Sequence, residues 1–218
     1  MAGFILVYSI GYCRGGENRR GNMRKSLALF LILFEIFKQC VNSLTGIPDG
    51  AYIPLEVCSL AEYAILIDAF WPNNRYFKQL LAFAFLPSAL MALILPTVIT
   101  YPPISFYAGH QFLLHGGIAA YIIARYAAGE IRPRYIGVWI TYFTILLVIQ
   151  PVILINKTFH MNYMFLSYHS NNVALKFIWD VTGGQGGAIY IFGLSVLVAV
   201  VMHIMYGIYV LIGKVRKE

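Results

Sequence analysis

Apolar residues follow one another along this chain in long stretches, and polar residues gather in the short segments between them. A helix that crosses the hydrocarbon core of a membrane needs about 20 predominantly apolar residues. Six stretches reach or approach that length, so the pattern predicts an all-α fold, a polytopic transmembrane helix bundle with six full spans. The predicted spans are residues 26–45, 54–71, 77–95, 105–127, 135–156 and 187–213.

A shorter apolar segment, Phe4 to Cys13, precedes the first predicted span. Its length of about ten residues is too short for a span, and it lacks the basic head of a signal peptide. A connector rich in glycine and arginine, GGENRRGNMRK, follows it. We therefore expect a truncated apolar stub and a basic connector over residues 1–25, the stub being a candidate seventh span. Residues 26–218 are expected to form a single six-helix transmembrane domain.

Composition supports this interpretation, since 60% of the 218 residues are hydrophobic and only 11% are charged. A soluble chain carries about 25% charged residues, so a soluble globular domain is excluded. The net charge of +7 would suggest nucleic acid only if the basic residues shared one soluble face. Here the basic residues lie in the short segments between the apolar stretches, so the expected partners are membrane lipids and not nucleic acid.

The loops alternate in charge, as expected for a protein that crosses a membrane several times. Thirteen of the 16 Lys and Arg residues fall in every second loop and in the C-terminal tail, whereas the opposite loops hold only Lys157 and Lys176. Lys38 remains inside the first span. Cytoplasmic loops are the ones enriched in Lys and Arg. The C-terminus is therefore predicted to be cytoplasmic.

With this topology, the polar residues inside the spans gather in the outer half of the membrane. An intramembrane ionisable residue is costly and usually lines a cavity or a relay. We expect one polar cluster that opens outward, above inner halves that are nearly pure hydrocarbon. In the first span one helical face carries Glu35, Lys38, Gln39 and Asn42. The other members are Glu56, Cys58 and Glu62 of the second span, His110 and His115 of the fourth, and Asn156 of the fifth.

Cys58 and His115 are the candidate catalytic pair in this cluster. A thiol attacks an acyl carbonyl once an imidazole removes its proton, and a thioester results. Amides such as Gln39 and Asn156 could bind an oxyanion or a lipid headgroup without adding charge. In the competing interpretation Cys58 is a small apolar side chain and His115 joins helices by a hydrogen bond. Three cysteines imply no disulfide framework, and no metal or cofactor is expected.

Five segments of the chain resemble the YwaF and transmembrane protein 164 family of polytopic membrane proteins. They are FEIFKQ, IPLEVCSLAEY, HQFLLHGG, IRPR and NKTFHMNYMFL, and their order and spacing agree from about Lys25 onward. The resemblance implies six to seven helices and, from the animal member, acyl transfer on ether phospholipids by a cysteine and a histidine. By motif position these residues are Cys58 and His115. The family is also similar in helical arrangement to androgen-induced membrane hydrolases of fatty-acid esters, which use threonine with histidine.

The last of these segments adds Asn162 and Tyr163 as supporting residues, and the expected location is a bacterial plasma membrane. The sequence thus predicts an integral membrane lipid acyltransferase or acyl hydrolase with an outward-facing polar cavity. Two alternatives remain open. One is a proton-coupled small-solute transporter that uses the acidic residues of the cluster. The other is a non-catalytic membrane protein, and the substrate and the oligomeric state are unspecified.

Overall fold

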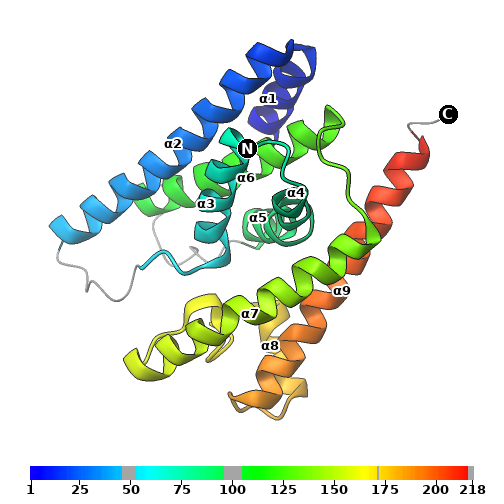
Figure 1. Cartoon of the computed structure of the whole chain (residues 1–218). Coiled ribbons are helices and arrows are strands. Elements are labelled where there is room, and N and C mark those ends of the chain that lie inside the picture. The colour runs from blue at the N-terminus through cyan, green and yellow to red at the C-terminus, as the bar shows by residue number, and fades with distance from the viewer. Residues whose placement is uncertain (46–52, 96–104, 171, 216–218) are drawn as a thin grey trace. The chain divides into compact units, whose positions relative to one another are not determined.

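The computed structural model describes residues 1–45, 53–95, 105–170 and 172–215, and every regular element in these ranges is helical (Figure 1). The predicted all-α class is therefore confirmed. Contacts along the chain divide it into two compact units, Met1–Pro133 and Arg134–Glu218. The expectation of a single domain over 26–218 stays a prediction.

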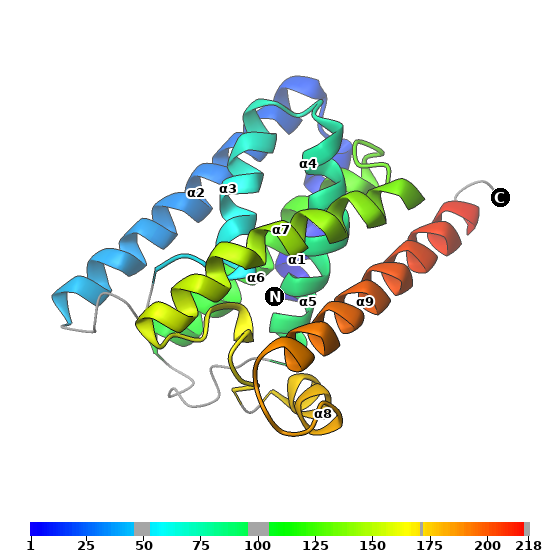
Figure 2. The same cartoon turned by 60° about the horizontal axis from the view of Figure 1, so that its bottom comes forward.

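Unit 1 is arranged around one helix, α6, which contacts four other helices of the unit. Small residues let the neighbours approach closely. A Cβ atom added at Gly117 of α6 would lie 2.7 Å from Cδ2 of Leu31 on α2. In both views α3 runs beside α2 (Figures 1 and 2). The elements are α1 (Ala2–Arg14), α2 (Glu17–Leu44), α3 (Val57–Phe70), α4 (Arg75–Leu80), the π-helical turn η2 (Leu81–Phe85), α5 (Leu86–Ile94) and α6 (Phe106–Ala127).

The stretch from α4 to α5 is one continuous helix with a widened turn in its middle. The π-helical turn η2 immediately precedes the first turn of α5, where Pro87 lies. Proline has no backbone N–H, and its ring clashes with the carbonyl group four residues earlier. A π-type turn relieves this conflict without ending the helix.

Unit 2 consists of α7 (Tyr135–Phe159), the short 3-10 helix η4 (Tyr163–Phe165), α8 (Val173–Val181) and α9 (Ala188–Val215). α9 packs on both α7 and α8. Helix α7 ends at His160, which has a left-handed backbone conformation with φ of 54°. Three more non-glycine residues with positive φ follow before α8. The segment between α7 and α8 is thus compact, although it contains little regular structure.

Four of the described helices are long and apolar enough to cross a membrane, and they match the first, third, fifth and sixth predicted spans. Helix α3 has only 14 residues, which is about 21 Å of helix and less than a hydrocarbon core of about 30 Å. Helix α6 has 22 residues but is not among the helices that are apolar enough to span. The count of six spans is therefore not confirmed. The stub is a helix of 13 residues, α1, which is too short to span.

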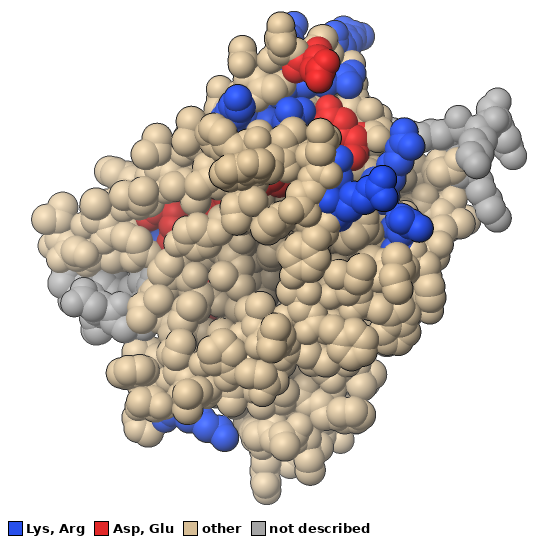
Figure 3. Space-filling model, viewed as in Figure 1, with Lys and Arg blue, Asp and Glu red and all other residues tan. Residues whose placement is uncertain are grey.

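The surface agrees with a membrane protein. Most of the face seen in Figure 3 is uncharged, and Lys and Arg side chains gather where α1 turns into α2. Many large apolar side chains are exposed on α2, α7 and α9, for example Leu33, Leu147 and Ile189. In water this exposure would be costly, but lipid chains can cover it.

Candidate functional site

The candidate site begins with Glu35, a buried carboxylate on the middle of α2. Lys38 Nζ lies 2.6 Å from its Oε1, and Gln39 Nε2 donates a hydrogen bond of 2.8 Å to the same oxygen. His110 Nε2 of α6 lies 3.5 Å from the other oxygen, Oε2. One carboxylate therefore connects two turns of α2 with α6. The predicted shared face of Glu35, Lys38 and Gln39 is present.

The imidazole of His110 is buried between aromatic rings. It stacks on Phe34 of α2 with ring centroids 4.6 Å apart, and Phe106 lies 6.0 Å away. Tyr107, one turn before His110 in α6, donates a hydrogen bond of 2.9 Å to Asn42 Oδ1 of α2. The junction of α2 and α6 thus combines ring packing with polar contacts, and both keep His110 next to Glu35.

Glu62 of α3 completes this group, which we call the α2–α3–α6 cluster and define as Glu35, Lys38, Glu62 and His110. Its side chain is almost fully buried and interacts electrostatically with Glu35 and Lys38. Neither carboxylate oxygen of Glu62 has a hydrogen-bond partner among the described residues. A buried carboxyl group without a partner is costly unless it holds a proton or contacts a ligand.

Cys58 lies one turn before Glu62, at the start of α3. Its Sγ donates to Ser88 Oγ of α5 over 3.9 Å, and it is near enough to Glu62 for an electrostatic interaction. Ser88 was not predicted, because nothing in the sequence pattern relates α3 to α5. Within the described ranges, no hydrogen bond joins Cys58 to His115. The predicted pair is therefore not hydrogen-bonded in this structure.

His115 is buried in α6, and its Nδ1 lies 2.7 Å from the backbone oxygen of Gln111. A carbonyl oxygen can only accept a hydrogen bond, so Nδ1 carries the hydrogen. In the neutral ring Nε2 then has a free lone pair. His115 also interacts electrostatically with Lys38 and His110, which places it near the α2–α3–α6 cluster.

The remaining predicted residues are one that interacts electrostatically with Cys58 and three that belong to unit 2. Glu56 is the residue before the first turn of α3. Asn156, Asn162 and Tyr163 belong to unit 2, where the side chain of Asn156 bonds to the Tyr163 backbone. Asn162 uses both ends of its amide for the backbone of residues 167 and 168 and for the hydroxyl group of Ser170. In this structure both amides shape the segment after α7.

A second polar group, which the sequence pattern did not predict, lies near the other end of α3 and α6. We call it the Glu130 network. The Arg125 guanidinium forms an ion pair with the fully buried Asp68, and the Tyr121 hydroxyl group donates to Asp68 over 2.7 Å. The predicted topology places this network toward the cytoplasmic ends of α3 and α6, and the expectation of nearly pure hydrocarbon in the inner halves stays a prediction. The members of the Glu130 network are Tyr12, Arg24, Asp68, Tyr121, Arg125 and Glu130.

Glu130 in the loop after α6 accepts most of the hydrogen bonds in this network. Its Oε2 accepts from Tyr12 at 2.8 Å, from Arg125 Nε at 2.9 Å and from Arg24 at 3.3 Å. Burial by itself raises the pKa of this carboxyl group. The hydrogen bonds from Tyr12 and Arg125 and the charges of Arg125 and Arg24 outweigh burial, so the pKa is lowered. The loop carboxylate thus ties α1, α2 and α6 together.

The two polar groups lie far apart along α6, because the separation of 15 residues between His110 and Arg125 corresponds to about 22 Å of helix. The Cys13 thiol, 4.0 Å from the Ala124 backbone oxygen, lies beside the Glu130 network, and the Cys58 thiol lies beside the α2–α3–α6 cluster. Within the described ranges, no three His, Cys, Asp or Glu side chains are grouped as a metal site. The chemistry available there is therefore that of a thiol, imidazoles, carboxylates and one ammonium group.

Comparison with known proteins gives one family. The sequence model of the TMEM164 family matches residues 1–206, which is nearly the whole chain. It is the family that the five sequence segments resemble. Neither the curated proteins nor the solved structures contain a match to this chain.

Proposed function

Because the chain belongs to the TMEM164 family of membrane proteins, we propose that it transfers or hydrolyses acyl groups of membrane lipids, with Cys58 as nucleophile and His115 as base. The observation that carries this proposal is the state of His115. Its Nδ1 is engaged with Gln111, and its basic Nε2 remains for a proton. The ring belongs to α6, which contacts α3, the helix that bears the thiol.

In the proposed reaction, His115 Nε2 removes the proton from Cys58 as the sulfur attacks the carbonyl carbon of a lipid ester. The C–O bond to the alcohol breaks, the alcohol leaves with the proton from His115, and a thioester remains on Cys58. Water or the hydroxyl group of a second lipid then attacks the thioester, and His115 accepts and returns the proton. Hydrolysis or acyl transfer results, and the thiol is restored.

The α2–α3–α6 cluster has a supporting role in this proposal. Glu62 interacts electrostatically with both Cys58 and Lys38, and Lys38 interacts with His115. The ammonium group of Lys38 offsets negative charge that would oppose thiolate formation. The oxygens of Glu62, which have no hydrogen-bond partner among the described residues, can accept a hydrogen bond from a substrate hydroxyl group. The thiol must move from Ser88 toward His115, and catalytic contacts often tighten only when substrate is bound.

The test is lipid turnover by purified protein in mixed micelles with a phospholipid that carries a radiolabelled acyl chain. We expect Cys58→Ala and His115→Ala each to lower the rate by roughly 100-fold or more. Cys40→Ala is the matched control, because Cys40 is an exposed thiol on α2. Unchanged turnover in both the Cys58 and His115 variants would refute the assignment, as would equal loss in Cys40→Ala.

A second candidate, proton-coupled transport of a small solute, is favoured by one specific observation. Glu62 is buried without a hydrogen-bond partner among the described residues and is close to the Glu35–Lys38 pair. Such a carboxyl group is suited to take up and release a proton. This candidate predicts proton-coupled flux in liposomes that Glu62→Gln and Glu35→Gln abolish and Cys58→Ala leaves intact. The acyl-transfer proposal predicts no such flux.

A further inference from the structure

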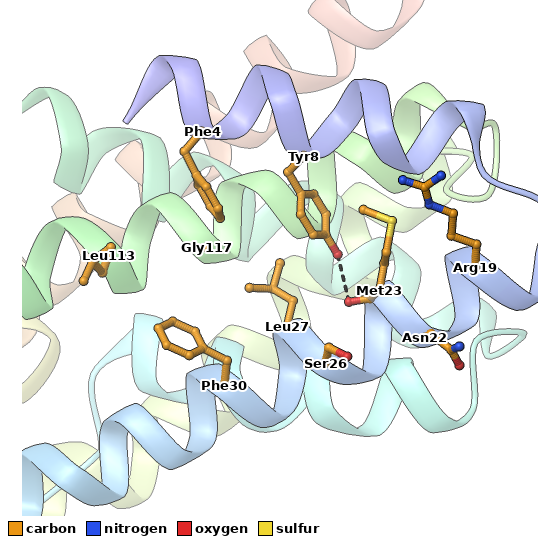
Figure 4. Close-up of a pocket in the computed structure, with 10 residues that line it drawn as sticks. All are labelled: Phe4, Tyr8, Arg19, Asn22, Met23, Ser26, Leu27, Phe30, Leu113 and Gly117. Carbon is orange, nitrogen blue, oxygen red and sulfur yellow. Dashed lines mark hydrogen bonds between the residues drawn. The ribbon is translucent and has the colours of Figure 1, made fainter.

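A pocket of about 690 Å³ lies between α1, α2 and α6, and the polar cluster around Glu35 takes no part in it (Figure 4). Residues of α1 form one wall, with Phe4 and Tyr8. Tyr8 is held there by a hydrogen bond of 3.0 Å from its hydroxyl group to the Met23 backbone oxygen. Leu113 and Gly117 of α6 form another side. All the lining residues belong to unit 1.

The α2 wall of this pocket changes from polar to apolar along one helical face. The lining positions on α2 follow one another at alternating intervals of three residues and one residue, so they share a face. They are Arg19, Asn22, Met23, Ser26, Leu27 and Phe30. The first and the last of these positions are 11 residues apart, which is about 16 Å of helix. Figure 4 shows Arg19 and Asn22 at one end of the pocket and Phe30 and Leu113 at the other.

The charged end of the pocket has an excess of positive charge. Arg20 and Arg24 are paired with Glu130, whereas Arg19 has no carboxylate within ion-pair distance in the described part of the chain. Arg19 is also exposed, as are Asn22 and Ser26. A guanidinium, an amide and a hydroxyl group together can bind a phosphate group. The apolar end exposes Phe4, Phe30 and Leu113 by 45%, 47% and 41%.

We propose that this pocket binds one anionic glycerophospholipid, with its phosphate at Arg19 and an acyl chain between Phe4, Phe30 and Leu113. Charge complementarity favours an anionic headgroup over a zwitterionic one, since unpaired basic residues beside a membrane helix attract anionic lipids. The proposal also gives a role to the packing of α1 on α6, because α1 forms one wall of the lipid site. This site is separate from Cys58 and does not depend on the proposed acyl transfer.

The test is native mass spectrometry of the full chain in detergent, titrated with phosphatidylglycerol or with phosphatidylcholine of identical acyl chains. We expect phosphatidylglycerol to bind roughly fivefold more tightly, the factor that one exposed basic residue contributes. Arg19→Gln should remove this preference, and Arg19→Lys should keep it. Arg14→Gln is the matched control, because Arg14 is exposed near the same end but does not line the pocket.

A second variant tests the apolar end. Leu113→Trp fills the pocket and should weaken binding of both lipids by roughly fivefold or more, whereas Leu147→Trp on the exposed surface of α7 should not. Inorganic phosphate should not displace the lipid, and Cys58→Ala should bind it as the wild type does. Absence of a headgroup preference, equal effects of Arg14→Gln and Arg19→Gln, unchanged binding by Leu113→Trp, or displacement by phosphate would each overturn the proposal.

Discussion

Two acidic side chains of unit 1 show how environment decides the role of a residue. Glu130 accepts hydrogen bonds from Tyr12, Arg24 and Arg125, so its negative charge is compensated by groups of the protein. Glu62 is more deeply buried, yet within the described residues neither of its oxygens accepts a hydrogen bond. The first group holds the structure together. The second is available for a proton or a ligand, so it supports the acyl-transfer proposal and is central only to the transport candidate.

Removing the charge of Glu130 should destabilise the protein in a pH-dependent way. The pKa of Glu130 lies below its ordinary value of 4.5, so its stabilising effect is full above that pH and is lost as pH falls through the lowered pKa. At pH 7 we expect Glu130→Gln to cost about 1.5–3 kcal/mol, the range for hydrogen bonds to a charged group. Thermal unfolding in detergent between pH 3 and 7 measures this difference.

Asp180→Asn is the control for that measurement, because Asp180 forms an exposed pair with Lys176. An exposed pair contributes only about 0–1 kcal/mol. The difference in unfolding temperature between wild type and Glu130→Gln should become smaller as pH falls. A gap that is constant from pH 7 to pH 3 would contradict the assignment of ionised Glu130 as the group that holds the network.

At this scale the sequence predicted same-helix neighbours well and contacts between helices poorly. Helical spacing was enough to group Glu35, Lys38 and Gln39, because three or four residues make one turn. Asp68 stands alone among apolar residues, and that pattern could have indicated a buried partner. No pattern in the sequence indicates the contact of Cys58 with Ser88, because this contact depends on how α3 packs on α5.

Among the elements, the end of α7 depends most on individual side chains. His160 ends the helix in a left-handed conformation, and the chain then turns through residues with positive φ. Asn156 accepts from the Tyr163 backbone N–H at 2.9 Å and donates to the Tyr163 backbone oxygen at 3.0 Å. The buried side-chain amide of Asn156 thus satisfies the backbone N–H and C=O groups of Tyr163, which lie outside any long helix.

Asn156→Ala should therefore loosen the segment after α7. The substitution removes both hydrogen bonds from a buried site, for which we expect a loss of about 1–3 kcal/mol. Thermal unfolding and the proteolysis rate of residues 160–170 report the effect. Gln150→Ala is the control, since Gln150 is exposed on α7 and bonds only to its own helix turn. Equal unfolding temperatures for Asn156→Ala and wild type would contradict this role.

For the whole molecule, orientation in the membrane is a prediction from charge alone. Thirteen basic residues on one side should keep that side cytoplasmic. We expect a green fluorescent protein fused after Glu218 to fluoresce in a bacterial host and an alkaline phosphatase fused there to be inactive. The control is a pair of fusions after Lys157, where the opposite result is expected. An active phosphatase at the C-terminus would invert the topology.

The sequence by itself determined that this is an all-helical membrane protein of the TMEM164 family, because apolar run length and segment order need no packing information. Only the tertiary structure decided that α3 is too short to span, that α1 packs on α6, and that Asp68 and Arg125 form a buried pair. The physical reason is that hydropathy measures each segment separately. Partners, pockets and unpaired groups exist only once different helices pack against one another.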